Sequence, residues 1–504
     1  MQKRVSQLFA FAHPVSLPKL RDPSLLKTQC YVNGKWVDAK SKKTFIVDNP
    51  STLAEVSKCP EFDQQDTEEA ILTAQSAFTS FRKTPARERA RLLRRWHELM
   101  MENMEDLALI ITLENGKPLA DARTEVKYAA SFFEWFSEEA PRIYGDTIQA
   151  SNPGCRLMTV KEPVGVCSLI APWNFPAAMI TRKAGPALAA GCAVVVKAPG
   201  EAPLTALAIA ELGHRAGIPA GVFNVITALE NTVEIGKVLT THPVVKKVSF
   251  TGSTGVGKIL MNQASSTIKK LSFELGGNAP FIVFDDADLD VAVRGLIACK
   301  FRISGQTCVC ANRIFVHASV YDTFVQKVLE VVKTFRIGDG LDSETTHGPL
   351  IHDRAIAKVH EHVQDAVSKG ARIVHGGERL TEVGARFFGI TLLADMKPGM
   401  KICDEETFGP VAAFFPFETE EEVIRVANET EVGLAGYFFS RDNKRCWRVA
   451  EALDVGMVGV NVGAISDPAA PFGGVKQSGF GREGSKYGID EYLITKMIMT
   501  GIDT

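Results

Sequence analysis

The stretch Val164–Lys197, VGVCSLIAPWNFPAAMITRKAGPALAAGCAVVVK, decides the fold of this chain. Residues 164–170 are a short apolar run typical of a buried strand, and residues 192–197 are a second run of the same kind. Between them, after a loop with two prolines, residues 178–190 have the composition of a helix. Two buried strands joined by a helix predict a βαβ unit, whose strands are parallel and covered on both faces.

The same alternation continues along the chain on both sides of Gly276. Before it, the pattern predicts helices at 203–217 and 231–240 and strands at 221–227 and 246–251. After it, the pattern predicts strands at 279–284, 313–316, 411–415 and 456–462 and helices at 285–301, 319–335 and 353–369. The fold class is therefore α/β, with a Rossmann-type first unit and a second α/β unit.

The N-terminal part has a different pattern. Residues 31–36 contain Asn-Gly and predict a hairpin, and residues 66–81, 86–115 and 119–140 predict long amphipathic helices. Residues 146–163 indicate an extended hairpin, and 491–499 alternate in a way that suits pairing with another subunit. The resulting division is a tail (1–30), a dinucleotide-binding domain (31–145 and 164–276), a catalytic domain (277–475) and an oligomerisation arm (146–163 and 476–504).

Composition limits the classes of function. The chain has 504 residues, of which 45% are hydrophobic and 23% charged, as in ordinary globular proteins. A net charge of −2 argues against nucleic-acid binding, and no run of about 18 apolar residues predicts a membrane span. The ten cysteines are scattered without paired spacings, which favours a reducing compartment.

The N-terminus leaves two compartments open. Residues 1–21 carry four Lys or Arg side chains, and the first acid is Asp22. This pattern fits a short mitochondrial presequence or a basic tail on a cytosolic enzyme. The predicted location is therefore cytoplasmic or the mitochondrial matrix.

A glycine-rich turn follows the strand at 246–251. In Thr251–Lys258, TGSTGVGK, the glycines at a strand-to-helix turn, Gly252 and Gly257 among them, would let backbone N–H groups approach a pyrophosphate, and the helix N-terminus would favour its charge. The same letters resemble the start of a P-loop. A P-loop needs Ser or Thr after its lysine, and this chain has Ile259. The turn favours a dinucleotide over a nucleoside triphosphate.

The segment Phe301–Cys310, FRISGQTCVC, presents a thiol among small and polar residues. Turn amides near Cys308 would lower its pKa and produce the nucleophilic thiolate. Glu274 stands before two glycines, and burial would raise its pKa toward that of a general base. The alternatives are a packed cysteine and a helix-cap or loop carboxylate. The strand at 279–284 carries the chain away from Glu274 by about 20 Å, and the following helix returns it by about 25 Å. The side chains of Glu274 and Cys308 can therefore meet.

Two polar residues at strand ends and a pair of histidines on a predicted helix are further candidates. Asn174 lies between two prolines and two aromatic residues, which would hold its amide rigidly as a donor to an oxyanion. The alternative is an asparagine that only forms a turn. Lys197 precedes Pro199-Gly200 and either reaches a ribose or phosphate of adenosine or is a surface lysine. His360 and His362 alternate on a predicted helix without a third ligand, which indicates a solvated helix and no metal site.

Several motifs occur together in a specific order. These are Pro172–Pro176, Phe250–Gly257, Phe273–Gly277, Gly305–Cys308 and Glu405–Pro410. Over roughly residues 30–500 the chain closely resembles the aldehyde dehydrogenase superfamily. Within it, the chain is similar to succinate-semialdehyde dehydrogenases at Met179–Lys183, Lys300–Arg302, Gln306–Cys310 and Lys476–Gly488.

The resemblance implies a mechanism. Cys308 would attack the aldehyde carbon while Asn174 and the Cys308 backbone N–H hold the oxyanion. A hydride would pass to a nicotinamide and leave a thioester, and Glu274 would activate the water that releases the acid. The implied substrate is succinate semialdehyde, with glutarate semialdehyde or another small ω-carboxy aldehyde as the alternative.

The resemblance also implies binding residues. Glu406 would hold the nicotinamide ribose with Phe408 packed beside it, and further cofactor contacts would come from Trp173, Lys197 and Ser253. Arg182, Arg302 and Ser478 match positions that grip the distal carboxylate, and guanidinium groups with a hydroxyl suit a carboxylate. Either arginine could instead form a surface ion pair.

Gly200 bears on cofactor choice and Cys310 on regulation, whereas Ile303 is a departure from relatives to which no function is assigned. Gly200 stands where many relatives have a glutamate, whose charge would repel a 2′-phosphate, so NADP is favoured and NAD is also expected. Ile303 replaces a polar asparagine of close relatives. Cys310 lies two residues after the nucleophile, and in similar enzymes this pair forms an inactivating disulfide, although Cys310 could also be simple packing. Relatives are dimers or tetramers, so a homo-oligomer is expected.

Overall fold

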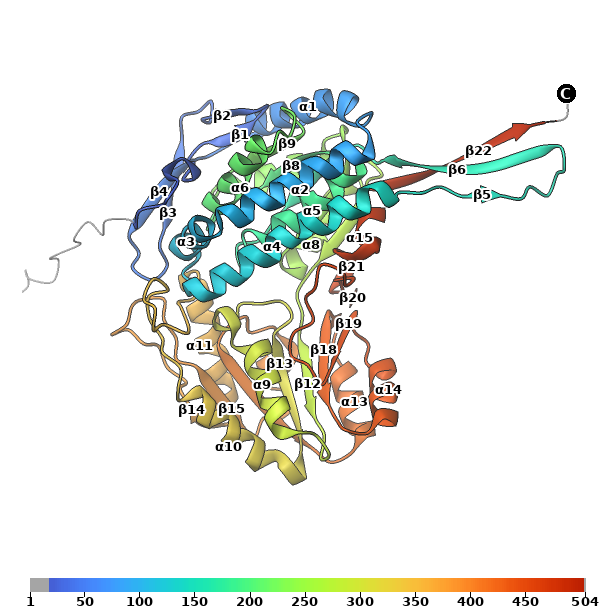
Figure 1. Ribbon diagram of the computed structural model, residues 1–504. Coiled ribbons are helices and arrows are strands. Elements are labelled where there is room, and N and C mark those ends of the chain that lie inside the picture. Colours follow the sequence, from blue (N-terminus) through green and yellow to red (C-terminus); the bar gives the residue numbers. More distant parts are fainter. Residues whose placement is uncertain (1–17, 503–504) are drawn as a thin grey trace, which may run out of the picture.

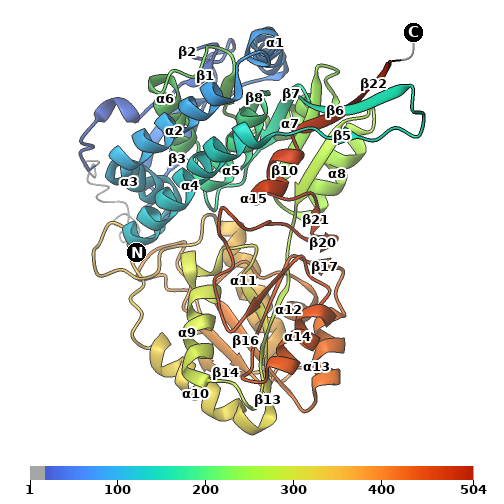
Figure 2. The same cartoon turned by 45° about the vertical axis from the view of Figure 1, so that its right-hand side comes forward.

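The computed structural model describes residues 18–502. The segment predicted as a presequence or basic tail lies almost entirely outside the described residues. Figure 1 shows two α/β bodies, the N-terminal one above the C-terminal one, and a thin arm that projects sideways. In Figure 2 the last part of the chain, with β20 and β21, runs between the two bodies.

Residues 164–197 form the predicted βαβ unit. β7 (Val166–Ile170) and β8 (Ala193–Lys197) are parallel neighbours joined by α5 (Ala178–Ala190). Val194 and Val196 of β8 pack in one hydrophobic core, whereas Val195 packs in another. Successive side chains of a strand point to opposite faces, so an unbroken apolar run is what a strand covered on both sides requires.

This unit is the centre of an eight-stranded sheet. The strand order is β2-β1-β9-β8-β7-β10-β11-β21, in which β7 to β11 are parallel and β1, β2 and β21 pair antiparallel. The remaining strands are β1 (Cys30–Val32), β2 (Lys35–Val37), β9 (Phe223–Ile226), β10 (Val245–Thr251), β11 (Lys270–Glu274) and β21 (Gly479–Phe480). The mostly parallel sheet was predicted, but β11 was not.

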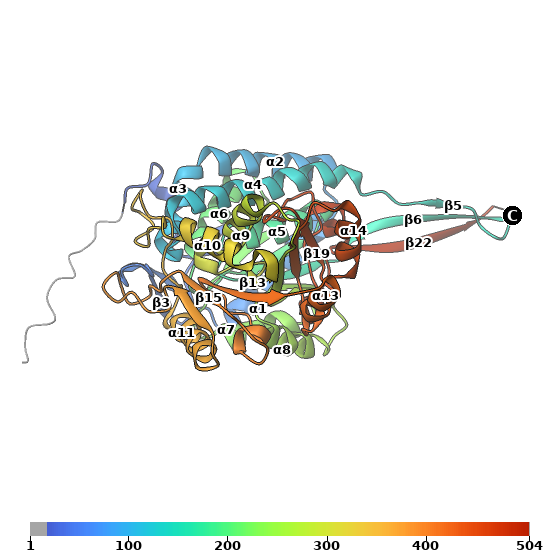
Figure 3. The same cartoon turned by 90° about the horizontal axis from the view of Figure 1, so that it is seen from below.

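Helices cover both faces of this sheet, as Figure 3 shows from below. One layer packs against the core that holds Val194, and the other against the core that holds Val195. The first contains α2 (Ala86–Glu102), α3 (Met104–Asn115), α4 (Leu119–Glu139), α5 and α6 (Leu204–Arg215). The second contains α1 (Gln64–Phe81), α7 (Thr232–Thr241) and α8 (Thr254–Ala264).

Two local predictions in this body have different outcomes. The hairpin at residues 31–36 is confirmed, with positive φ at both Asn33 (55°) and Gly34 (73°), the combination of a type I′ turn. The single helix predicted at 86–115 is wrong. It is interrupted at Asn103, whose side-chain amide donates to the carbonyl of Leu99 (2.8 Å). Asparagine competes in this way with the helical hydrogen bonds of the backbone.

The C-terminal body has a seven-stranded sheet in the order β14-β15-β16-β13-β12-β18-β19, parallel except at β14. Its strands are β12 (Ala279–Val283), β13 (Ala311–His317), β14 (Arg372–His375), β15 (Thr391–Ala394), β16 (Val411–Phe417), β18 (Ala435–Phe439) and β19 (Met457–Val460). Its helices are α9 (Leu289–Lys300), α10 (Tyr321–Val332), α11 (Asp353–Ser368), α12 (Lys401–Asp404), α13 (Glu420–Asn428) and α14 (Asn443–Ala452). The sequence reading missed β14, β15, β18, α13 and α14.

The arm is a three-stranded antiparallel sheet of β5 (Thr147–Ile148), β6 (Cys155–Pro163) and β22 (Leu493–Gly501). β22 pairs with β6 of the same chain from Leu493 opposite Pro163 to Gly501 opposite Cys155. The alternation at 491–499 thus serves pairing within the chain. Two small two-stranded sheets complete the fold, namely β3 (Thr44–Asp48) with β4 (Glu55–Pro60) and β17 (Val432–Gly433) with β20 (Val475–Lys476).

The boundary of the arm differs from the predicted one. The prediction assigned all of 476–504 to the arm, but β21 joins the N-terminal sheet, and α15 (Ser485–Asp490) packs on α4 and α5. Ser485, Gly488 and Ile489 are buried there. The rest of the domain division stays a prediction. No helix within residues 18–502 is both long and apolar enough to cross a bilayer.

Candidate active site

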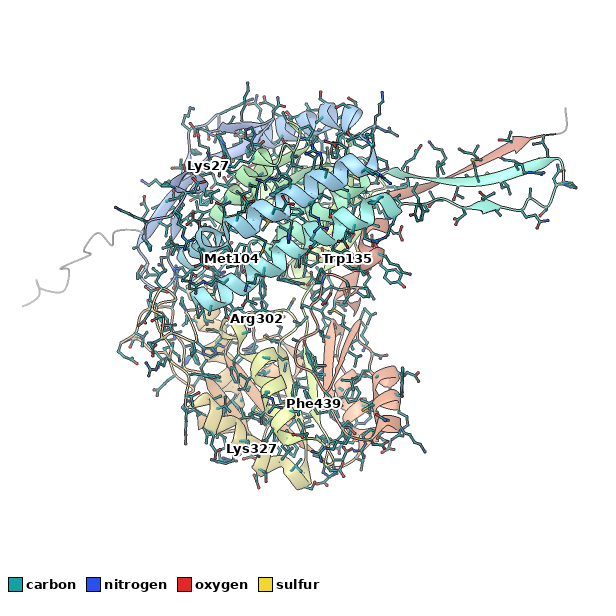
Figure 4. The ribbon with its side chains drawn as sticks, in the orientation of Figure 1. Lys27, Met104, Trp135, Arg302, Lys327 and Phe439 are labelled. Carbon is teal, nitrogen blue, oxygen red and sulfur yellow. The ribbon has the colours of Figure 1, made fainter. Side chains whose placement is uncertain are left out.

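Two cavities meet at Cys308, which contributes to the wall of each. The larger, of about 390 Å³, is lined from both bodies, by Trp173, Asn174 and Ser253 on one side and by Glu406 and Phe408 on the other. The smaller, of about 80 Å³, is lined by side chains that include Tyr128, Phe175, Arg182, Arg302, Ser466 and Phe472. Figure 4 shows Arg302 between the two bodies. Cys308 is the residue that the two linings share, so its sulfur can contact both a reactant in one cavity and a group bound in the other.

Cys308 lies in the loop between α9 and β13. Its thiol donates a hydrogen bond to Glu274 Oε1 (3.3 Å). The predicted lowering of its pKa is wrong. Burial raises the pKa of Cys308 to about 12, although the positive charge of Arg182 acts in the opposite direction. The resting thiol is therefore protonated, and a base must take its proton during attack.

Glu274 is the last residue of β11 and is only 4% exposed. Its Oε2 accepts from Thr251 Oγ1 (3.1 Å) and forms an ion pair with Arg182. Gly277, three residues further on, is required by the close approach of the loop that carries Cys308. A Cβ at Gly277 would lie 2.5 Å from the carbonyl oxygen of Cys308. The predicted meeting of this carboxylate and the thiol is confirmed.

Asn174 is buried in the loop between β7 and α5 and lines the larger cavity together with Cys308. Its amide nitrogen donates to the carbonyl of Gln306 (3.1 Å), two residues before the thiol. The amide is thus tied to the loop that carries the nucleophile. Its role as an oxyanion donor stays a prediction.

The three residues expected to grip a carboxylate lie in different surroundings. Arg182 lines the smaller cavity, but its guanidinium is ion-paired with both Glu274 and Glu483. Arg302 lines the same cavity, makes no ion pair within residues 18–502, and has its Cζ 5.1 Å from the centre of the Phe175 ring. Arg302 is therefore the cation available to a ligand.

The placement of Ser478 in the substrate site is wrong. Its side chain is fully buried, donates to the carbonyl of Gly276 (2.7 Å) and accepts from the N–H of Gly433 (2.9 Å). The serine that lines the smaller cavity is Ser466, which the sequence reading missed. No motif marks it, because it lies in an irregular stretch after β19 and reaches the cavity only through the fold.

Of the predicted cofactor residues, Trp173, Gly252, Ser253, Glu406 and Phe408 line the larger cavity. The ring centres of Trp173 and Phe408 are 5.7 Å apart and nearly perpendicular. Phe408 has a positive φ of 55°, a strained conformation that is most often kept at functional sites. Burial raises the pKa of Glu406 to about 7, and the charge of Lys358 opposes this.

The other predicted cofactor residues do not line this cavity. Gly257 packs against Leu275, where a Cβ would lie 2.6 Å from a methyl group. Gly200 packs in the same way against Leu229. Lys197 donates to the carbonyl of Ala228 and to Thr232 Oγ1, both at 3.0 Å, and burial lowers its pKa to about 8. Lys197 ends β8 at the same sheet edge as the turn after β10, since both strands are in register with Ile170 of β7.

Three basic residues of the larger cavity were missed. His352, Arg354 and Lys358 lie at and just inside the start of α11. Only the fold brings this helix from the C-terminal body over the turn after β10. The positive charges of Arg354 and Lys358, with the helix start at Ser253, suit the phosphates of a dinucleotide.

Cys310 and His362 complete the predicted positions. Cys310 is buried, is a free thiol, and its Sγ donates to the carbonyl of Lys300 (3.5 Å), away from the cavities. The prediction that His362 is exposed to solvent on its helix is wrong. It is 1% exposed and shares a hydrogen bond with Thr407 Oγ1 (3.1 Å), so it supports the loop that carries Glu406. No cluster of metal-ligating side chains occurs in the part of the chain that the structure describes.

The chain is similar to known proteins over most of its length. A profile of the aldehyde dehydrogenase family matches residues 36–498. The NADP(+) succinate-semialdehyde dehydrogenase 1 of Schizosaccharomyces pombe is 58% identical over 468 residues, 93% of this chain and 94% of that protein. The glutarate-semialdehyde dehydrogenase of Pseudomonas putida is 54% identical over 484 residues, 96% of this chain and 100% of that protein.

Solved structures give the same result. The crystal structure of an E. coli NADP-dependent enzyme has a TM-score of 0.95 and 53% identity, and it covers 96% of this chain and 100% of that chain. The match spans both bodies and the arm. The chain belongs to the aldehyde dehydrogenase family.

Proposed function

We propose that the protein oxidises succinate semialdehyde to succinate and passes the hydride to NADP, with NAD also used. The observation that carries this proposal is the position of Cys308 at the junction of two cavities, in contact with Glu274. Relatives at 53–58% identity include enzymes named for succinate semialdehyde and for glutarate semialdehyde. Glutarate semialdehyde is therefore the second candidate substrate.

The residues supply each proton transfer of such a reaction. As the sulfur of Cys308 bonds to the carbonyl carbon, its proton passes to Glu274 Oε1, to which the thiol is already hydrogen-bonded. The Asn174 amide and the Cys308 N–H stabilise the oxyanion. NADP bound in the larger cavity supplies the hydride acceptor. Cys308 is left as a thioester. Glu274 releases the thiol proton to solvent and, as a carboxylate again, takes a proton from the water that cleaves the thioester.

Recognition of the distal carboxylate is assigned to Arg302, with Ser466 beside it in the smaller cavity. Arg302 has no competing acid among the described residues, and guanidinium binds carboxylate through paired charge-assisted hydrogen bonds. Arg182 adds positive charge to the same wall while its own contacts hold Glu274 in place.

Replacement of Arg302 by leucine tests this recognition. We expect kcat/KM for succinate semialdehyde to fall about 10- to 100-fold, mostly through KM, because one charge-assisted hydrogen bond contributes about 1.5–3 kcal/mol. Activity on an uncharged aldehyde of similar length, such as butanal, should change by less than about threefold. Ser466→Ala should also lower kcat/KM for succinate semialdehyde more than for butanal, but by a smaller factor. Equal losses on both substrates would contradict the assignment.

Cofactor use is tested by the absorbance of the reduced nicotinamide at 340 nm, with succinate semialdehyde and each cofactor in turn. Gly200 packs against Leu229, so no side chain fits at position 200, which supports NADP, although the charges of Glu201 and Glu61 act on Lys197. A larger kcat/KM with NAD would contradict the preference. Absence of reduction with either cofactor would contradict the proposed function.

We retain Cys310 as a redox partner of Cys308. Peroxide should oxidise Cys308 to a sulfenic acid, and attack by Cys310 would then form the disulfide and release water. The loop must move for this, since the two Sγ atoms contact different groups. We expect inactivation that dithiothreitol reverses in the wild type, and lasting inactivation in Cys310→Ser as Cys308 is overoxidised. Absence of a Cys308–Cys310 disulfide from the mass spectra of peroxide-treated wild-type protein would contradict this proposal.

The arm supports a homo-oligomer. Met158, Met497 and Met499 are exposed on its strands, together with Ile494 and Ile498. Exposed apolar side chains on a projecting sheet are typical of a subunit contact. The compartment, cytosol or mitochondrial matrix, stays a prediction.

A further inference from the structure

The loop Trp173–Ala177, which carries Asn174 and is called here the donor loop, is held by polar side chains from the junction of α3 and α4. Asn115, at the end of α3, donates from its amide to the carbonyl of Trp173 (2.9 Å). Lys117 donates from Nζ to the carbonyl of Asn174 itself (2.7 Å). Neither contact is explained by the reaction steps, because neither side chain touches Cys308 or Glu274.

Lys117 is an unusual group to find in such a position. Its side chain is 1% exposed, and it forms an ion pair with Glu125 of α4, which is fully buried. Burial lowers the pKa of Lys117, and the charge of Glu125 opposes this. The other carboxylate oxygen of Glu125 accepts from the N–H of Ala177 (2.9 Å). The pair therefore fixes the donor loop at two points, one on each side of Phe175.

These contacts matter because the Asn174 side chain is itself weakly held. Its amide nitrogen has one partner, the carbonyl of Gln306, and its Oδ1 has no hydrogen-bond partner among the described residues. The direction of the amide must therefore be set by the backbone of the donor loop. An error of about 1 Å in the position of a reacting group can cost about 100-fold in rate.

The same junction also contacts the nucleophile loop. Asp121 Oδ2 accepts from the N–H of Ile303 (3.3 Å). Ile303 and Ser304 have left-handed φ values of 44° and 52°, which a β-branched residue adopts only under constraint. One surface of the helical layer thus supports both loops whose relative position the oxyanion contact requires.

We propose that Lys117, paired with Glu125, is a positioning residue for the aldehyde oxidation, which aims the Asn174 amide at the developing oxyanion. A purely structural ion pair is the competing explanation, yet buried ion pairs are poor stabilisers compared with apolar packing. The donation to the Asn174 carbonyl gives the charge a specific role. The inference rests on the proposed chemistry at Cys308 but not on the identity of the aldehyde.

The test is a double-mutant cycle between Lys117 and Asn174. Lys117→Met alone would leave the Glu125 carboxylate buried and unpaired, so Lys117→Met/Glu125→Gln is the second variant, in which the glutamine oxygen still accepts from Ala177. We expect kcat to fall about 10- to 100-fold with KM within about threefold, since the lost contact acts in the transition state. In an Asn174→Ala background the same changes should lower kcat by less than about threefold.

Lys247→Met is the matched control. Lys247 is also a fully buried lysine paired with a glutamate, Glu491 (3.4 Å), but it contacts neither loop. The Lys247→Met substitution should lower the melting temperature of the protein while leaving kcat within about threefold of the wild-type value. The positioning role is overturned if a folded Lys117 variant keeps its kcat, or if its loss multiplies with that of Asn174→Ala. Rates are measured on the best aldehyde available, so failure of succinate semialdehyde as a substrate would be a separate result.

Discussion

Replacement of Cys308 by alanine is expected to lower kcat for aldehyde oxidation by at least about 10⁴-fold, the largest loss for any single substitution in this protein. The sulfur is the one group placed where both cavities open, and no other described thiol lines both. Substrate binding should persist, because Arg302 and the walls of the smaller cavity are untouched. Steady-state reduction of NADP and a fluorescence titration of the variant with succinate semialdehyde would measure the two effects separately.

Cys446→Ala is the matched control for this loss. Cys446 is a free, partly exposed thiol on α14, away from both cavities, so its removal should change kcat by less than about twofold. Retention of more than about one per cent of the activity in a folded Cys308→Ala protein would contradict nucleophilic catalysis by this residue.

Replacement of Glu274 by glutamine is expected to lower kcat by about 10²- to 10⁴-fold. The amide keeps the shape of the side chain but cannot accept the thiol proton or prime water. Because burial holds the pKa of Cys308 near 12, the thiolate fraction without a base is very small. Both the first turnover and the later ones should therefore slow, which stopped-flow measurement of NADPH formation would resolve.

The pH dependence of this variant gives a second readout. The free thiolate fraction rises about tenfold per pH unit below the thiol pKa. We therefore expect kcat/KM of Glu274→Gln to increase with pH across the range in which the protein is folded, while the wild type, which has its own base, rises less steeply. Parallel pH profiles for the two proteins would contradict proton transfer from Cys308 to Glu274.

Much of the fold could be predicted because its signals are local. Residues 164–197 contain two strands and a helix whose lengths and apolar patterns need no distant partner to be recognised. The Asn33-Gly34 turn is equally local, since those two residue types favour positive φ. Strands such as β15 and β18 escaped detection because residues 391–394 and 435–439 are too short to stand out from helical or loop sequence.

The site was predictable only in part, for a related reason. Cys308, Glu274 and Asn174 carry distinctive neighbours in the sequence, and the fold brings them together. Ser466 and Lys117 have no such mark. Ser466 is seen only when the cavity is formed, and the contact of Lys117 with Asn174 spans 57 positions. The raised pKa of Cys308 likewise follows from burial between two bodies, which a turn sequence cannot indicate.

The most direct test of the account is identification of the covalent intermediate. Glu274→Gln protein incubated with succinate semialdehyde and NADP, quenched with acid and digested with a protease, should carry a succinyl group on the peptide that contains Cys308, because cleavage of the thioester lacks its base. Peptide mass spectrometry would locate the adduct. An acyl group on another residue, or a first turnover of NADPH without any adduct on Cys308, would contradict the central claim.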